Sequence, residues 1–356
     1  SERNIITGLD IGTSKIIALV GEITPTGSVE LIGVGRHPSL GLKRGVVIDI
    51  ELTVQAIQRA VEEAELMAGC EIASVYAGIA GSHINSMNSH GIVAIRDNEV
   101  TAADVERVLE AAKAVAIPAD QKILHVLPQE FIIDGQGAIR EPVGMAGVRL
   151  EAQVHIVTGS VSAAQNIDKC IRRCGLDVND IVLEQLASSH AVLTDDEKEL
   201  GVCLIDIGGG TTDIAIFHAG AIRYTAVIPV AGDQVSNDIA MALRTSSKSA
   251  EAIKVGHGSA VVDLASGSKM IEVGSSESLV RKISIKSLAE VIAARYEEIF
   301  ILARNEIARS GFQDLIGAGI VLTGGASSVS GAVQLAEMHF EMPVRLGVAK
   351  QMKGLE

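Results

Sequence analysis

Short apolar runs broken by glycine-rich turns dominate the first 80 residues and predict strands. One amphipathic helix interrupts them: its apolar positions recur at steps of three and four from Val54 to Ala68, and Gly69 closes it. A meander of three strands, a short fourth strand, the helix and a last strand together predict half of an α/β domain. The predicted strands are 5–11, 16–23, 29–36, 46–48 and 73–79.

Residues 84–158 interrupt this pattern and predict an inserted small α+β subdomain. The polar stretch 82–91 predicts a loop, and Thr101 with Asp104 predicts a capped helix that runs to about residue 116. A glycine-rich hairpin region is expected at 135–147. The predicted strands of the insertion are 123–127, 130–133 and 150–158.

The second half of the chain returns to an α/β pattern and ends with one long helix. The acidic stretch 195–199 predicts a solvated linker, and 245–280 predicts serine and glycine turns with short strands. The stripe Ile285, Leu288, Ile292, Tyr296, Ile299, Ala303 and Ile307 predicts a helix over 284–309. The other predicted elements are helices at 160–174, from 184, at 233–243 and at 249–254, and strands at 178–183, 202–205, 214–217, 222–228 and near 344.

The glycine turn at 206–213 is the strongest chemical signal in the chain. The turn Asp206-Ile-Gly208-Gly209-Gly210-Thr211-Thr212-Asp213 joins two apolar runs, which predicts a β-hairpin. Its glycines expose backbone N–H groups that can bind a phosphate, and its threonines add hydroxyl donors. Asp206 would repel a phosphate, so we expect it to hold Mg²⁺ through water. A glycine turn without a ligand is the alternative.

The same pattern occurs 196 residues earlier, where Asp10-Ile-Gly12-Thr13-Ser14-Lys15 follows one apolar run and precedes another. A repeat at this distance predicts two similar halves that face each other across a cleft, each contributing one hairpin to a shared phosphate. A third glycine turn, Thr-Gly324-Gly325-Ala326-Ser327, leaves a strand and is expected to open a helix.

Composition narrows the functional classes. The net charge of −14 argues against nucleic-acid binding, which requires a basic surface. Aromatic residues make up 2% of the chain, so the cores must be aliphatic. Cys70, Cys170, Cys174 and Cys203 form no disulfide or metal-binding pattern, and Cys170 and Cys174 are expected to be small buried residues. No signal peptide or run of 18 apolar residues is present, which favours a soluble protein of a reducing compartment.

The order and spacing of the three glycine turns resemble those of the actin, heat-shock chaperone and sugar kinase ATPase superfamily. Within it, the chain resembles the FtsA family of bacterial cell-division proteins over its whole length. The insertion carries the particular match, through Pro142-Val-Gly-Met and Leu150-Glu-Ala to His155-Ile-Val-Thr-Gly159. Family members continue to a membrane-binding amphipathic helix, so the resemblance implies that this chain, ending at Glu356, is truncated.

The resemblance implies a two-lobed actin-like ATPase fold of class α/β and assigns roles to the matching residues. Gly12–Lys15 and Gly208–Thr212 would hold the phosphates of ATP or ADP, with Mg²⁺ held through water by Asp10 and Asp206. Gly324–Ser327 resembles the adenosine motif, Gly232 would line the site, and Glu251 and Lys254 would contact ribose and base. Glu184 lies where relatives place the group that orients the attacking water.

The resemblance also implies four subdomains. The first core subdomain would comprise 1–83 and 159–195, and the inserted FtsA-specific subdomain 84–158. The second core subdomain would comprise 196–232 and 310–356, and the small subdomain of the second lobe 233–309.

Two classes of function stay open. In one, the protein polymerises and tethers FtsZ filaments to the inner membrane early in assembly of the divisome, with ATP as a conformational ligand and at most weak Mg-dependent hydrolysis. In the other, it is an active ATPase or a small-molecule kinase of the same superfamily. The first implies contacts with other divisome proteins, no nucleic acid, and a location in the cytoplasm, at the inner membrane of the division site.

Partner contacts are also implied by the family. The insertion is expected to touch a neighbouring subunit of a filament. The acidic and apolar FtsZ C-terminal tail is expected to bind near the long helix, through Arg281 and Arg295. The alternative for these arginines is ordinary solvated surface charge.

Overall fold

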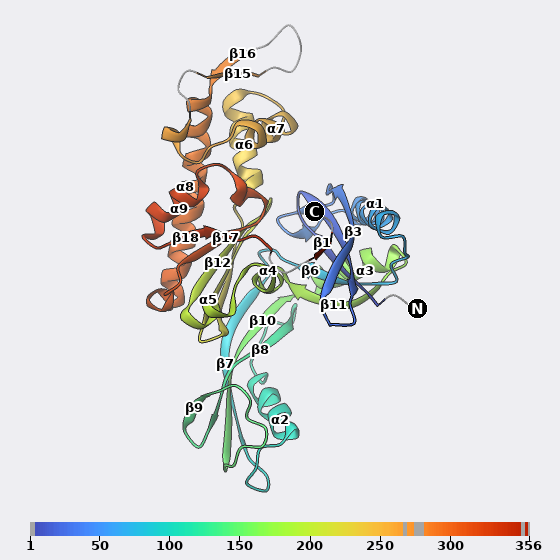
Figure 1. Cartoon of the computed structure of the whole chain (residues 1–356), viewed down its shortest axis with the longest axis vertical. Helices are drawn as coiled ribbons and strands as arrows, with labels where there is room; N and C mark the ends of the chain where they lie inside the picture. Colours follow the sequence, from blue (N-terminus) through green and yellow to red (C-terminus); the bar gives the residue numbers. More distant parts are fainter. Residues whose placement is uncertain (1–3, 266–268, 274–280, 350–352, 355–356) are drawn as a thin grey trace.

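The structure is a computed structural model that describes residues 4–265, 269–273, 281–349 and 353–354. The parts of the serine- and glycine-rich prediction that fall on 266–268 and 274–280 lie outside these residues. Figure 1 shows two lobes side by side, with helix α4 (Glu184–Val192) between their sheets. The predicted two-lobed α/β fold with an inserted α+β subdomain is confirmed.

The first lobe is built on a six-stranded sheet in the order β11-β6-β1-β2-β3-β19. Helix α1 (Ile50–Ala68) packs directly on β3, because Gly35 and Gly33 have no side chains there; a Cβ at Gly35 would lie 1.7 Å from the Ala60 carbonyl oxygen. The other elements of this lobe are β1 (Ile5–Ile11), β2 (Lys15–Ile23), β3 (Val29–Pro38), β4 (Leu42–Lys43), β5 (Val46–Val47), β6 (Ser74–Ile79), α3 (Val161–Arg173), β11 (Asp177–Leu183) and β19 (Lys353–Gly354).

The second lobe repeats this topology in a five-stranded sheet with the order β14-β13-β12-β17-β18. In each lobe an antiparallel three-strand meander is joined to two parallel strands. The predicted relation between the two halves is therefore present in strand order and direction. The elements are α5 (Asp195–Leu200), β12 (Val202–Ile207), β13 (Thr212–His218), β14 (Ala221–Ile228), β17 (Ile320–Thr323), α9 (Ala332–Phe340), β18 (Val344–Leu346) and the short 3-10 turns η2 (Gln313–Leu315) and η3 (Gly325–Ser328).

The long helix α8 (Ile285–Ser310) runs along the second lobe and extends into the part of this lobe at the top of Figure 1. The whole predicted stripe from Ile285 to Ile307 is buried, and Gly311 ends the helix in the left-handed conformation. Although aromatic residues are rare, Tyr296, Phe300 and Phe340 pack together here. The remaining elements are α6 (Gly232–Leu243), α7 (Ser247–His257), η1 (Val262–Leu264), β15 (Met270–Val273) and β16 (Arg281–Ser284).

The insertion lies at the lower end of the molecule in Figure 1 and has its own apolar core. Its sheet has the order β7-β10-β8-β9, and Leu150, Val154 and Ile156 of β10 are fully buried under α2. The predicted capping box of Thr101 and Asp104 is confirmed. The elements are β7 (Asn85–Ala94), α2 (Ala102–Ala112), β8 (Gln121–Ile133), β9 (Gln136–Ile139) and β10 (Arg149–Ser160).

The insertion leaves the first lobe but makes hydrogen bonds to β14 of the second. Ser86 Oγ donates to the Thr225 carbonyl oxygen at 3.1 Å, and Asn88 Nδ2 donates to the Arg223 carbonyl oxygen at 3.1 Å. Arg140 also pairs with Glu199 and donates to the Ala219 carbonyl oxygen. The insertion therefore bridges the two lobes below the cleft.

Two predictions in the insertion were wrong for the same reason. The predicted loop 82–91 is largely strand β7; its residues are polar because Ser86 and Asn88 bond to the second lobe. The predicted pair of strands 123–127 and 130–133 is one strand, β8, with a bulge at Gln129. The bulge turns Gln129 toward the second lobe, where Nε2 donates to the Ile222 carbonyl oxygen at 2.9 Å.

Two further predictions were wrong, one about a linker and one about the end of a helix. The linker predicted at 195–199 is helix α5, started by a capping box of Thr194 and Glu197, and Glu197 also pairs with Arg345. Helix α2 ends at Ala112, about four residues earlier than predicted.

The four cysteines are free. Cys170 is buried, and Cys174 is partly buried with its Sγ 3.6 Å from the Val54 carbonyl oxygen. Burial raises the pKa of both thiols to about 11, so they are protonated at neutral pH and unreactive.

His155 provides a test of the contact between the insertion and the second lobe. Its side chain is 1% exposed and lies between Asn88 Oδ1 at 2.8 Å and Thr225 Oγ1 at 2.9 Å. Burial lowers the pKa of His155 to about 4, so the folded protein holds a neutral ring whereas the unfolded chain binds a proton below about pH 6.5. Stability is therefore lost as the pH falls from about 6.5 toward 4, by roughly 2 kcal/mol at about pH 5.

Urea unfolding of the wild type and His155→Gln at neutral pH and at about pH 5 measures this contribution. We expect the variant to be less stable at neutral pH but to lose less stability on acidification, because the other titrating groups are common to both proteins. Equal losses in the two proteins would contradict the assignment.

Candidate functional site

The two predicted phosphate hairpins have the same register and the same turn. Asp10 lies opposite Ile17 across β1 and β2, and Asp206 lies opposite Asp213 across β12 and β13, so six residues separate the paired residues in both hairpins. The Gly12 N–H donates to the Lys15 carbonyl oxygen at 3.1 Å. In the second hairpin, the Gly208 N–H donates to the Thr211 carbonyl oxygen at 3.0 Å.

The two turns meet across the cleft. A Cβ at Gly209 would lie 3.1 Å from Ser14 Cβ, and a Cβ at Gly210 would lie 2.6 Å from Thr13 Oγ1. Thr13 Oγ1 also accepts a hydrogen bond from the Gly45 N–H at 2.9 Å. The opposite lobe therefore requires glycine at 210 and leaves little room for a side chain at 209, and a phosphate between the turns would be in reach of both.

Four carboxylates gather below these turns: Asp10, Asp206, Asp213 and Glu184. Asp10 keeps an exposed surface, yet the surrounding protein and the nearby Asp206 raise its pKa to about 6, against an opposing effect of Lys15. Burial, and then Asp206, raises the pKa of Asp213 to about 8. Burial and the other three carboxylates raise the pKa of Glu184 well above its ordinary value.

This cluster suits a divalent cation that is bound through water molecules. In the part of the chain that the structure describes, no three acidic, histidine or cysteine side chains are placed to bind a metal ion directly. Asp213 Oδ1 is buried and has no hydrogen-bond partner among the described residues, while Thr211 donates to Oδ2. Ser188 Oγ donates to Asp206 Oδ2 at 2.7 Å. Hydrated Mg²⁺ would supply the positive charge and the donors that these oxygens lack.

The third glycine turn closes on the second. A Cβ at Gly324 would lie 2.4 Å from both Asp206 Oδ1 and the Ile207 carbonyl oxygen, and Gly324 has a φ of +88°. The predicted helix opening is a 3-10 turn, in which Ser327 Oγ donates to the Thr323 carbonyl oxygen. Tyr296 of α8 fixes this turn through its hydroxyl, 2.5 Å from the Ala326 carbonyl oxygen.

Helix α6 begins at the same place. The Gly232 N–H donates to the Gly208 carbonyl oxygen at 3.0 Å, and the Asp233 N–H donates to the Gly209 carbonyl oxygen at 2.8 Å. A Cβ at Gly232 would lie 3.1 Å from Ala326 Cβ. The second and third turns and the start of α6 therefore form one continuous wall.

Glu251 and Lys254 lie behind this wall in a shared network. Lys254 is 6% exposed, and its ammonium donates to the Gly232 carbonyl oxygen at 3.0 Å, to Ser236 Oγ at 2.8 Å and to Glu251 Oε2 at 2.7 Å. Its three N–H donors are thus all used within the protein. Partial burial works to raise the pKa of Glu251, but the bonds from Lys254 and Ser236 lower it overall. Glu251, half exposed, is the member that can reach a ligand.

Glu184 is the first residue of α4, directly after β11. Gly78 of the neighbouring strand β6 makes room for it, because a Cβ there would lie 3.1 Å from Glu184 Cγ. The side chain thereby joins the carboxylates of both hairpins.

Arg281 and Arg295 lie away from the cleft, and both contact α6. Arg281 is exposed on β16 and donates to the Leu243 carbonyl oxygen at 2.5 Å. Arg295 is 25% exposed and makes a two-pronged ion pair with Asp238, at 2.6 and 2.9 Å, as well as a pair with Glu298.

Four residues of the site were given no role from the sequence. Asp213 could have been found, because it closes the same motif as Asp206 and lies opposite it in the hairpin. Gly78, Ser188 and Ser236 carry no local signal, since their importance depends on contacts with distant parts of the chain.

Among the described residues no helix is both long and apolar enough to cross a membrane.

Comparisons with known proteins agree with this geometry. A family model described as "SHS2 domain inserted in FTSA" matches residues 81–158, and one described as "Cell division protein FtsA" matches residues 203–356. The chain is 64% identical over 352 residues to the cell division protein FtsA of Pseudomonas aeruginosa, covering 99% of this chain and 84% of that protein. It is 46% identical over 363 residues to the Escherichia coli FtsA, covering 100% and 86%.

Solved structures share the fold at low sequence identity. The PilM-PilN type IV pilus biogenesis complex contains a chain that matches with a TM-score of 0.70 and 15% identity, covering 98% of this chain and 90% of that one. MreB5 of Spiroplasma citri bound to ADP matches with a TM-score of 0.57 and 17% identity, covering 97% and 92%. The predicted actin-like fold is therefore confirmed.

Proposed function

Because the chain belongs to the FtsA family of cell-division proteins, we propose that it binds ATP or ADP with Mg²⁺, polymerises, and tethers FtsZ filaments to the inner membrane. The observation that carries the nucleotide part is the meeting of two equivalent glycine turns across the cleft, above a carboxylate cluster. That the MreB5 relative in fold was solved with ADP supports the same part.

Different residues of the cleft would bind different parts of the nucleotide. Backbone N–H groups of the turns Gly12–Lys15 and Gly208–Thr212, other than the Gly12 and Gly208 N–H groups used within the turns, bind the phosphates, with Lys15 adding positive charge. Asp10 and Asp206 hold the hydration shell of Mg²⁺, which neutralises phosphate charge when bound. Gly232, Glu251 and the turn Gly324–Ser327 line the adenosine side, with Lys254 positioning Glu251.

We propose that the chain has the four subdomains of the family, each with its own role. The core subdomains are 1–83 with 159–195, and 196–232 with 310–356. The insertion 84–158 contacts a neighbouring subunit in a filament, and the part 233–309 binds the FtsZ tail. The separate apolar core of the insertion supports treating it as a unit that contacts neighbours without disturbing the cleft. We also propose that the protein contacts other divisome proteins and acts at the cytoplasmic face of the inner membrane.

Binding of the FtsZ tail gives the direct test of the partner assignment. Arg281→Glu changes an exposed side chain and should weaken binding of a labelled tail peptide, about tenfold at low salt and less at high salt, because it reverses a charge that attracts an acidic segment. Fluorescence anisotropy measures the affinity. Arg304→Glu, on an exposed arginine farther along α8, is the matched control and should bind the peptide as the wild type does.

Arg295→Glu should weaken peptide binding too, but it also places a third acid beside Asp238 and Glu298. Its thermal stability must therefore be measured alongside. Equal affinity of the wild type, Arg281→Glu and Arg295→Glu for the peptide would leave both arginines as surface charge and remove them from the proposal.

A further inference from the structure

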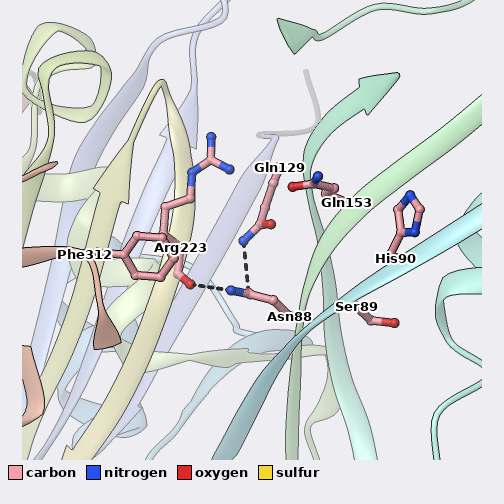
Figure 2. A pocket seen from close by; sticks show the side chains of 7 residues that line it. All are labelled: Asn88, Ser89, His90, Gln129, Gln153, Arg223 and Phe312. Carbon is pink, nitrogen blue, oxygen red and sulfur yellow. Dashed lines mark hydrogen bonds between the residues drawn. The ribbon is translucent and has the colours of Figure 1, made fainter. Parts of the chain in front are cut away.

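An open pocket of about 290 Å³ lies where the insertion meets the second lobe, and all but one of its lining residues are polar. None of them belongs to the predicted nucleotide site. Figure 2 shows Arg223 of β14 and Phe312 on its second-lobe side, and the insertion residues Asn88, His90, Gln129 and Gln153 on the other. A ligand in this pocket would therefore contact two parts of the chain that are far apart in sequence.

The insertion side of the pocket is held in place by hydrogen bonds. Gln129 is 8% exposed, and its Nε2 donates to Asn88 Oδ1 at 3.0 Å and to the Ile222 carbonyl oxygen at 2.9 Å. Asn88 in turn donates to the Arg223 carbonyl oxygen and contacts the buried His155. These bonds fix the pocket's polar groups before any ligand arrives, which lowers the entropic cost of binding.

Arg223 has a half-buried positive charge without a carboxylate partner. Its Nε donates to the His218 carbonyl oxygen at 3.1 Å, and burial lowers the pKa of its guanidinium, with Glu130 acting in the opposite direction. Within the described ranges no acid lies at ion-pair distance from it. The other partly buried arginines there are all paired: Arg107 with Asp104, Arg295 with Asp238 and Arg345 with Glu197.

We propose that this pocket binds a carboxylate group, through the two terminal nitrogens of Arg223. These nitrogens form a planar fork that matches a carboxylate in two parallel hydrogen bonds. Gln153 supplies a neutral amide, and Phe312 packs against the organic body of the ligand. Arg223 carries one positive charge, and the nearby Glu130 offsets part of it, which disfavours a doubly charged phosphate more than a singly charged carboxylate.

The carboxylate can come from a small organic acid or from an acidic side chain of a peptide. The test uses succinate, a capped pentapeptide with one central glutamate, and inorganic phosphate, each titrated into the full chain while the side-chain amide NMR signals of Gln129 and Gln153 are followed. We expect succinate or the peptide to shift both signals, and phosphate to bind more weakly. Arg223→Gln should weaken the carboxylate affinity by at least about tenfold.

Arg96→Gln is the matched control, because it removes the same charge from an exposed arginine of the insertion outside the pocket. It should bind as the wild type does. If Arg223→Gln fails to fold, Arg223→Lys keeps the charge without the fork and should still bind more weakly. A response to one probe alone supports the proposal and identifies the source of the carboxylate. No shift with either carboxylate, equal shifts in Arg223→Gln, or equally tight phosphate binding would overturn it.

Discussion

Gly209→Val should abolish nucleotide binding. A Cβ at this position would lie 3.1 Å from Ser14 Cβ and 3.2 Å from Asp233 Oδ1, so the two further methyl groups of valine would occupy the space between the two phosphate turns. Phosphates could then enter only if the lobes moved apart. We expect the affinity for Mg·ATP, measured by calorimetry, to fall by about 100-fold or more, equivalent to about 3 kcal/mol.

Asp206→Ala should have a comparable effect for a different reason. It leaves the space between the turns open but removes a carboxylate that is proposed to face Mg²⁺ and that accepts a hydrogen bond from Ser188. Its loss of affinity should therefore shrink when Mg²⁺ is omitted, whereas the loss in Gly209→Val should not. The two variants separate the steric and the ionic parts of the site.

Gly8→Val provides the matched control. It makes the same substitution on the strand that leads into the first phosphate turn, but a Cβ at Gly8 meets no atom within 4 Å. Valine is also favourable in a strand. This variant should bind Mg·ATP as the wild type does. Wild-type affinity for Mg·ATP in both Gly209→Val and Asp206→Ala would contradict the proposal that the nucleotide binds between the two turns.

The parts of the site that the sequence reveals are those with a local signal. Each glycine turn follows an apolar strand and can be recognised alone, and the equal spacing of Asp10 and Asp206 before their turns predicts the symmetry that the sheets display. The helix stripe from Ile285 to Ile307 is similarly local, since its periodicity is independent of its partners.

The parts that were missed depend on contacts between distant segments. Strand β7 looks like a loop because its outward side chains are polar, and they are polar because Ser86 and Asn88 form hydrogen bonds to the other lobe. The sequence also gives no sign that Lys254 is buried, and only the fold brings Gly232 and Ser236 to its ammonium. Hydrophobic periodicity carries no information about such polar interfaces.

In the proposed function, the carboxylate cluster would connect nucleotide binding to hydrolysis. In the protein without ligands, Glu184 is surrounded by Asp10, Asp206 and Asp213, and burial together with their charges favours its protonated form. A cation at Asp10 and Asp206 would reverse this effect, because positive charge nearby favours the ionised carboxylate. Glu184 would then accept a hydrogen bond from a water molecule only when the nucleotide and its cation are present, which agrees with the proposed role of the nucleotide as mainly a conformational ligand.

Glu184→Gln should consequently lower hydrolysis while nucleotide binding persists. The amide has nearly the same shape and fits beside Gly78, but it orients a water molecule less well than a carboxylate does. We expect the rate of phosphate release in a single turnover to fall by about 10- to 100-fold from a wild-type rate that is itself low. The affinity for Mg·ATP should stay within a few-fold, because the phosphates are assigned to the two glycine turns and not to Glu184.

The unliganded variant should also be more thermally stable than the wild type, since it removes one of four crowded carboxyl groups without leaving a cavity. Glu62→Gln makes the same change on the exposed face of α1 and should alter neither hydrolysis nor stability appreciably. An unchanged rate in Glu184→Gln would assign the positioning of water to another residue of the cluster. A parallel loss of binding and hydrolysis would instead make Glu184 part of the nucleotide-holding site.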